Sequence, residues 1–303
     1  MARTRYAPDR GLSARMGLTM FLLGVLYVVL MAVVISFTTI PWFFIVVLAL
    51  GLAWGQWYFS DRLALSAMRG RVVTPEEAPE LHAMVDRLCA LADMPKPKVA
   101  IADVDIPNAF ATGRSPDRAV VCVTTGLMGR LEQQELEGVL AHELSHVAHR
   151  DVTVMTTASV VAVLAGLLVR SAMWSSMFGG RGRDNNNTAL VFLVVMLVSV
   201  VVYALSYLLI RALSRYRELS ADRTGALLTG RPSALGSALV KISGEMGRIP
   251  TRDLRQVEAY NAFFIFPAFT KGFDFSTLFS THPPLDRRLE QLTKISSQLG
   301  QAG

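Results

Sequence analysis

The sequence predicts a mainly α-helical membrane protein, in which helical transmembrane segments accompany an α+β domain with a small sheet. Of its 303 residues, 52% are apolar and only 18% are charged, which is more apolar surface than the core of a soluble protein absorbs. The second observation is a set of four apolar runs, each near the roughly 20 residues that cross about 30 Å of hydrocarbon. The runs cover residues 16–36, 42–59, 152–174 and 188–210.

The first two runs predict a helical hairpin in the membrane, residues 1–60. Only FTTIP (37–41) separates them, and this connection is too short for a domain. Arginines before the first run resemble the charged leader of a secretory signal. The run is longer than a signal core, however, and no small-residue cleavage site follows it. The hairpin is therefore expected to stay in place as an anchor.

The net charge of +6 is explained by arginines beside the apolar runs, because cytoplasmic flanks of transmembrane helices collect basic residues. Arg62, Arg69 and Arg71 follow the second run, whereas FTTIP is uncharged. We therefore expect a multi-pass protein of the inner or plasma membrane whose soluble domain faces the cytoplasm. Nothing indicates a nucleic-acid partner, because no basic stripe is interleaved with aromatic residues on a polar segment.

Two soluble segments, 61–151 and 211–303, are expected to form one domain, interrupted by a second apolar hairpin over 152–210. TPEE (74–77) supplies an N-cap, a proline and a carboxylate, so a helix is expected from there to Ala92. Short β-branched stretches predict strands over 98–104 and 119–125, and IPNAFATG (106–113) is expected to be extended. Apolar periodicity predicts further helices over 132–150, 211–228, 233–246 and 284–299.

The two cysteines, Cys89 and Cys122, match no CxxC or disulfide-framework spacing. A thiol nucleophile needs a histidine partner, and no neighbouring motif supplies one. Both are therefore expected to be reduced, buried residues.

The helix over 132–150 carries AHELSHVAHRD (141–151), with three of the five histidines of the chain. The i, i+4 spacing of His142 and His146 puts both imidazoles on one helix face, about one turn apart, which suits two ligands of a tetrahedral zinc ion. Glu143 can accept the proton of a water that the metal activates. The alternative is a polar helix face whose histidines bind water or carboxylates, and the helical context favours the metal.

A third ligand must come from elsewhere. His149 lies near the same face but about 10 Å farther along the axis, too far to share an ion with bonds of about 2 Å. Glu218 is the candidate, and Asp222, at i+4 on the same helix, can accept the free N–H of a ligand histidine. Taken alone, SRYRELSADRTGA favours ordinary helix salt bridges of these acids with Arg215 or Arg217.

The ordered motifs AHELSHVAHRD, SRYRELSADRTGA and STHPPLDRRL (280–289), with the N-terminal hairpin, resemble the HtpX-type membrane zinc metallopeptidases, relatives of the CAAX prenyl endopeptidases. The resemblance covers nearly the whole chain and implies a zincin-like α+β catalytic domain with a small, edge-exposed sheet. It implies one zinc ion held by His142, His146 and Glu218. Glu143 would then be the general base, and Asp222 would orient a ligand histidine.

The resemblance also implies a strand that binds an extended peptide substrate through backbone hydrogen bonds. Its residues are Asn108, Ala109, Phe110 and Ala111. His282, in the HPP segment, would lie near the active site. The oxyanion-stabilising side chain stays open among Tyr216, Arg223 and His282.

The expected function is that of a membrane-anchored zinc endopeptidase for misfolded or damaged membrane proteins, as the resemblance implies. The alternatives are a CAAX-type prenyl-peptide protease and a non-catalytic zinc-binding membrane scaffold. Four runs leave no room for the larger helical chamber of CAAX enzymes, and a scaffold would not need Glu143 beside an open metal position.

The third and fourth runs must either both cross the bilayer or both fail to cross it, because the ligands on either side of them have to meet. Arg181 and Arg183 lie between these runs. They weaken the arrangement in which both runs cross the bilayer, because these arginines would then lie on the non-cytoplasmic side.

Overall fold

The computed structural model describes residues 9–37, 68–113, 115–150, 186–248 and 283–300, together with single positions between 43 and 66. The chain divides into two compact units. One comprises Met1–Ser13, Phe59–Thr153 and Ser214–Gly303, and the other comprises Ala14–Tyr58 and Val154–Leu213. We describe each unit by itself.

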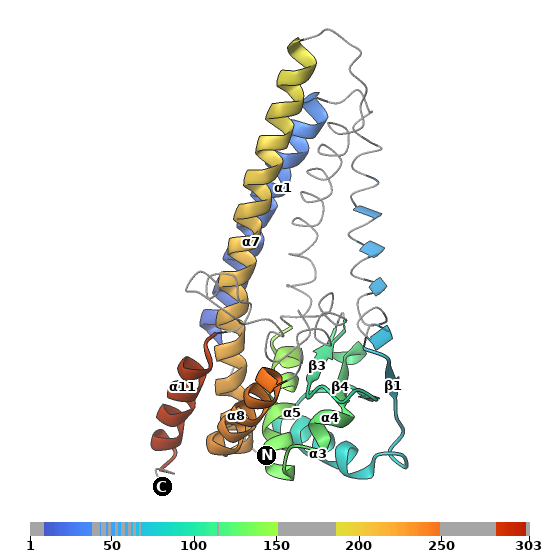
Figure 1. The fold of residues 1–303 in the computed structure, drawn as a ribbon, viewed down its shortest axis with the longest axis vertical. Coiled ribbons are helices and arrows are strands. Elements are labelled where there is room, and N and C mark those ends of the chain that lie inside the picture. Colours follow the sequence, from blue (N-terminus) through green and yellow to red (C-terminus); the bar gives the residue numbers. More distant parts are fainter. Residues whose placement is uncertain are drawn as a thin grey trace. The chain divides into compact units, whose positions relative to one another are not determined.

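The second unit contains the apolar parts of two long helices, α1 (Arg10–Phe37) and α7 (Asn186–Thr229) (Figure 1). Leu23, Leu30 and Val202 form a buried cluster between them, whereas Phe21 and Leu197 are 67% and 60% exposed. By length and composition, Arg10–Val33 and Leu193–Thr229 are the helices of the described residues that could cross a membrane. The predicted run 42–59 is described only at single positions, and 152–174 lies outside the described residues.

The first unit contains a small mixed sheet in the order β1-β2-β4-β3. Its strands are β1 (Gly70–Val72), β2 (Lys98–Ala102), β3 (Ala109–Thr112) and β4 (Val120–Thr124). β2 and β4 are parallel, and the other two pairs are antiparallel. Every side chain of β4 is buried, which matches its sequence VVCVT, β-branched at every position but Cys122. The strands predicted near 98–104 and 119–125 are confirmed, the extended segment becomes edge strand β3, and β1 was not predicted.

Helices complete this unit around the sheet. They are α3 (Pro79–Ala92), η1 (Pro116–Arg118), α4 (Thr125–Met128), α5 (Gln133–Ala148), the end of α7, α8 (Pro232–Arg248) and α11 (Leu285–Gln298). The expected start of the first helix at TPEE is wrong. There the Thr74 N–H donates to Glu77 Oε2 at 2.8 Å, so the capping residues close a turn, and Pro79 begins the helix instead.

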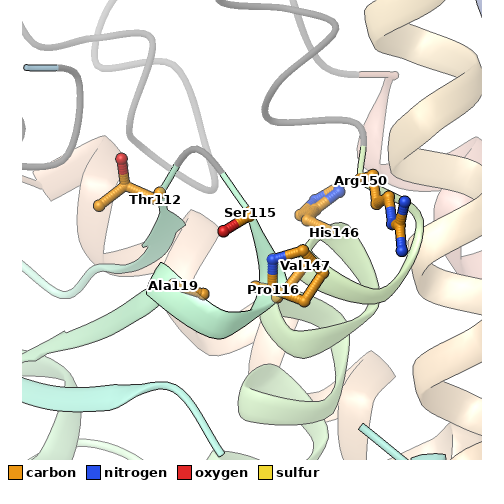
Figure 2. Close-up of a pocket in the computed structure, with 8 residues that line it drawn as sticks. Thr112, Ser115, Pro116, Ala119, His146, Val147 and Arg150 are labelled. Atoms are coloured by element: carbon orange, nitrogen blue, oxygen red, sulfur yellow. The ribbon is translucent and has the colours of Figure 1, made fainter. Parts of the chain in front are cut away.

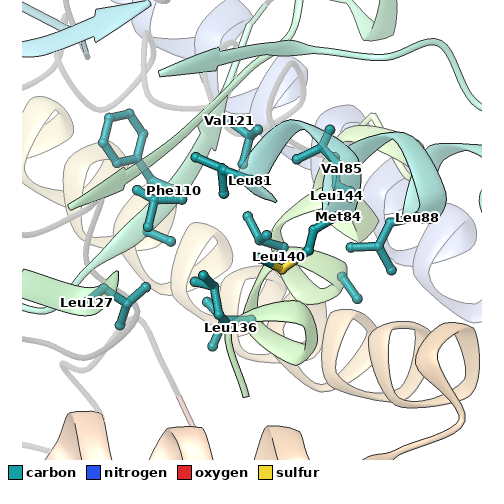
Figure 3. Close-up of a cluster of buried hydrophobic side chains, with 14 of the residues drawn as sticks. Leu81, Met84, Val85, Leu88, Phe110, Val121, Leu127, Leu136, Leu140 and Leu144 are labelled. Atoms are coloured by element: carbon teal, nitrogen blue, oxygen red, sulfur yellow. The ribbon is translucent and has the colours of Figure 1, made fainter. Parts of the chain in front are cut away.

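One hydrophobic core fixes α5 between α3 and strands β3 and β4 (Figure 3). Leu140 and Leu144 of α5 are 0% and 1% exposed. The two cysteines also belong to this core and are free. Burial raises the pKa of Cys89 to about 11 and that of Cys122 to about 12. Both thiols are therefore neutral near pH 7, and their burial confirms the prediction from the sequence.

A buried carboxylate ties α8 to the N-terminal turn of α5. Glu135 accepts hydrogen bonds from Ser237 Oγ at 2.6 Å and from Lys241 Nζ at 2.7 Å, and it also accepts the N–H of Glu132. Side chains of α8 and the backbone of Glu132 therefore both hold the start of α5.

Candidate metal centre

The two motif histidines lie on the buried face of α5. His142 and His146 are 2% and 5% exposed, and their ring centroids are 4.9 Å apart at 88°. One helical turn separates them, as the i, i+4 spacing requires. The local sequence thus places two imidazoles side by side on one helix face.

Helix α7 brings Glu218 next to both imidazoles. Glu218 Oε2 lies 3.5 Å from His142 Nε2, and Glu218 Oε1 lies 3.5 Å from His146 Nε2. Ligand atoms from all three residues lie within 4.8 Å of one another. Atoms bound about 2 Å from one tetrahedral ion lie roughly 3.3 Å apart, so this donor set fits a single metal ion. Arg217 Nη2 lies 3.8 Å from Glu218 Oε1, which is outside hydrogen-bonding distance.

Gly225 permits α7 to approach α5 this closely. A Cβ atom at position 225 would lie 2.9 Å from the backbone nitrogen of His142 and 3.2 Å from its Cα. Real Cβ atoms are not found at the shorter distance. A larger residue would therefore separate the helix that carries Glu218 from the helix that carries the histidines.

Gly225→Ala is expected to lower the free energy of unfolding by about 1–3 kcal/mol, because the methyl group overpacks a backbone contact. Zinc affinity should fall with it. Gly244→Ala is the matched control, since a Cβ there meets nothing within 4 Å, and alanine in a helix interior is favoured over glycine by up to about 1 kcal/mol. Thermal unfolding of both metal-free variants and zinc titration check this. Equal stability of the two variants would contradict it.

Asp222 is fully buried and lies beside the first histidine. Its Oδ1 atom is 2.9 Å from His142 Nδ1. Burial alone would lower the pKa of His142, but the hydrogen bond and charge of Asp222, together with Glu218, raise it to about 10. The metal-free protein thus holds a proton at His142 that a metal ion must displace, and metal affinity should weaken as the pH falls.

Glu143 lies between the helix and the edge strand. Its Oε2 atom accepts the N–H of Ala111 at 2.9 Å, so the backbone of β3 orients this carboxylate. Burial raises the pKa of Glu143, while the charges of His142 and His146 oppose the rise. A buried carboxylate with a raised pKa is a suitable proton acceptor near neutral pH.

The other residues that the sequence singled out are not among the three clustered residues. His149 ends α5, where its N–H donates to Ser145 O at 2.9 Å, and it is not part of the ligand cluster. Asn108, Ala109 and Phe110 are buried, and the Asn108 N–H donates to Thr124 Oγ1. Of the oxyanion candidates, Arg223 is exposed and His282 lies outside the described residues.

A small hollow adjoins His146, between the end of β3 and the end of α5 (Figure 2). It has room for about one water molecule beside His146. Its lining residues are Thr112, Gly113, Ser115, Pro116, Ala119, His146, Val147 and Arg150.

Sequence reasoning did not identify Arg288, which donates to both oxygens of Asp222 from α11. The motif STHPPLDRRL contains this arginine, but the sequence does not show which of Arg287 and Arg288 is buried.

Comparison with known proteins identifies the family of the chain. Protease HtpX homolog 1 of Streptomyces coelicolor is 60% identical over 300 residues, covering 99% of this chain and 98% of the relative. Protease HtpX homolog of Moorella thermoacetica is 54% identical over 303 residues, covering 98% of both chains. The crystal structure of S. mikatae Ste24p shares the fold, with a TM-score of 0.51 at 16% identity over 95% of this chain and 67% of that one. The model of peptidase family M48 matches residues 75–296. The chain therefore belongs to peptidase family M48, and it is a metalloprotease.

Proposed function

We propose that this metalloprotease is a membrane-anchored, zinc-dependent endopeptidase that cleaves misfolded or damaged membrane proteins. The observation that carries the proposal is the convergence of His142, His146 and Glu218, with ligand atoms within 4.8 Å of one another. Two imidazoles and a carboxylate are the donor set of catalytic zinc sites that keep a fourth position open. A scaffold with structural zinc would be closed by four protein ligands, and the cluster of the described residues has three.

Zinc held by His142, His146 and Glu218 would act as a Lewis acid, which would polarise a peptide carbonyl and make a water molecule easier to deprotonate. Glu143 accepts the proton of the attacking water and passes it to the leaving amine. The Ala111 N–H holds the Glu143 carboxylate in reach of that water. Asp222 Oδ1 lies 2.9 Å from His142 Nδ1, where it would orient the ring so that Nε2 is left to bind the metal.

Strand β3 is the proposed binding strand for the substrate. Within the described residues it pairs with β4 on one side only, and an extended peptide can add to the other side through backbone hydrogen bonds. The segment Asn108 to Ala111 would align that peptide with Glu143. His282 is proposed to approach the same site from the HPP segment.

The long apolar helices support anchoring in a lipid bilayer. α1 and α7 each carry an apolar stretch long enough to cross a bilayer, and an anchored protease meets substrates within or beside the membrane. The arginines that follow the second apolar run favour a multi-pass arrangement with the catalytic unit in the cytoplasm.

Purified full-length protein in detergent tests the proposal. Treatment with a zinc chelator should abolish cleavage of an unfolded membrane protein, and one equivalent of Zn²⁺ per chain should restore it. A prenylated CAAX peptide of matched length is the comparison substrate and should be cleaved much more slowly. Faster cleavage of the prenylated peptide would assign the site to CAAX processing, and metal-independent cleavage would refute the zinc mechanism.

A further inference from the structure

The C-terminal helix α11 places the charged side chain of Arg288 against Asp222 in the first unit. Arg288 is 0% exposed. Its Nε donates to Asp222 Oδ2 at 2.7 Å, and its Nη2 donates to Asp222 Oδ1 at 2.6 Å. This is the two-pronged arrangement in which a planar guanidinium fixes the plane of a carboxylate.

The same carboxylate oxygen continues the chain of contacts to the candidate metal site. Asp222 Oδ1 accepts from Arg288 and lies 2.9 Å from His142 Nδ1. The guanidinium therefore sets the direction of the oxygen that orients the imidazole. We infer that Arg288 is a positioning residue for the metal ligand His142, acting through Asp222, an inference that rests on the proposed zinc function.

Docking of α11 alone does not explain this buried charge. The same helix buries Leu292 and Ile295, which are 3% and 4% exposed. Gln291 Nε2 also donates to Leu219 O at 2.8 Å, which ties α11 to α7 without touching Asp222. A fully buried ion pair adds little to stability compared with apolar packing, because both ions must be desolvated. We therefore attribute the buried Arg288–Asp222 pair to its effect on the orientation of His142.

The position of Arg288 makes metal binding depend on the last helix of the chain. Partners that orient a ligand histidine typically change metal affinity by about 10–100-fold when they are removed. A lysine at 288 keeps the charge but offers a single ammonium in place of the planar fork. It should therefore hold the carboxylate less well than arginine does.

The experiment compares zinc affinity of full-length, metal-free proteins by competition with a chromophoric chelator. Arg288→Lys should bind zinc about tenfold more weakly than wild type, and Arg288→Met about 10–100-fold more weakly. Their cobalt-substituted forms should show altered d–d absorption bands. Arg287→Met, an exposed neighbour on the same helix, and Gln291→Met, which removes only the docking contact, should bind zinc within about twofold of wild type.

The outcomes separate this inference from the proposed function. Failure of the wild-type protein to bind zinc would overturn the zinc mechanism itself. Wild-type affinity and spectrum in Arg288→Lys would overturn the positioning role, even if Arg288→Met fails to fold. An equal loss of affinity in Gln291→Met would also overturn it, because helix docking would then be the cause. Non-additive losses in Arg288→Lys combined with Asp222→Asn would support action through Asp222.

Discussion

Replacing Glu143 with glutamine is expected to lower kcat by about 10²–10⁴-fold, which is the usual contribution of a general base, while the protein still binds one zinc ion per chain. Glutamine has the shape of glutamate, and its amide oxygen can keep the hydrogen bond from the Ala111 N–H. It cannot accept the proton of the attacking water. Cleavage of a membrane-protein substrate and of the protein itself, measured beside zinc content, checks this.

A second glutamate on the same helix provides the control. Glu137 is paired with Arg87 and Arg231, away from the ligand cluster. Glu137→Gln should change stability modestly and leave kcat within about twofold of wild type. Unchanged turnover in Glu143→Gln, at full zinc occupancy, would remove Glu143 from its proposed role.

Replacing Glu218 with alanine is expected to remove both zinc and activity. Glu218 is the metal ligand that we propose α7 supplies to the cluster, and without it the two histidines of α5 would hold the ion alone. The loss of affinity should exceed the about 10–100-fold cost of losing a residue that merely orients a ligand. Metal analysis after dialysis against a zinc buffer measures this loss, and a cleavage assay follows activity.

The two variants together separate metal binding from proton transfer. Glu143→Gln should retain zinc without turnover, whereas Glu218→Ala should lose both, and excess zinc should restore part of its activity. Full metal occupancy and normal turnover in Glu218→Ala would contradict the ligand set and leave the two histidines without a third partner.

Several local features could be predicted because their causes lie within a few residues. The i, i+4 histidines follow from helix geometry, and the β-branched run that became β4 needs no knowledge of distant segments. Where local signals competed, the prediction was less accurate. The Thr74 and Glu77 cap closes a turn, and helix α3 begins at Pro79. Strand β1, three residues long, is too short to show an alternating pattern.

The sequence alone therefore determined the helix with two imidazoles, two apolar helices of membrane-spanning length and strands β2 and β4. Tertiary structure decided which distant side chains meet them. Glu218 and Asp222 were equally typical of surface salt bridges, and the close approach of α7 to α5 at Gly225 brings both acids next to His142. Of two adjacent arginines, packing of α11 buries Arg288 and leaves Arg287 in solvent. Periodicity encodes which face of a helix is apolar, whereas contacts between remote segments depend on how those faces pack together.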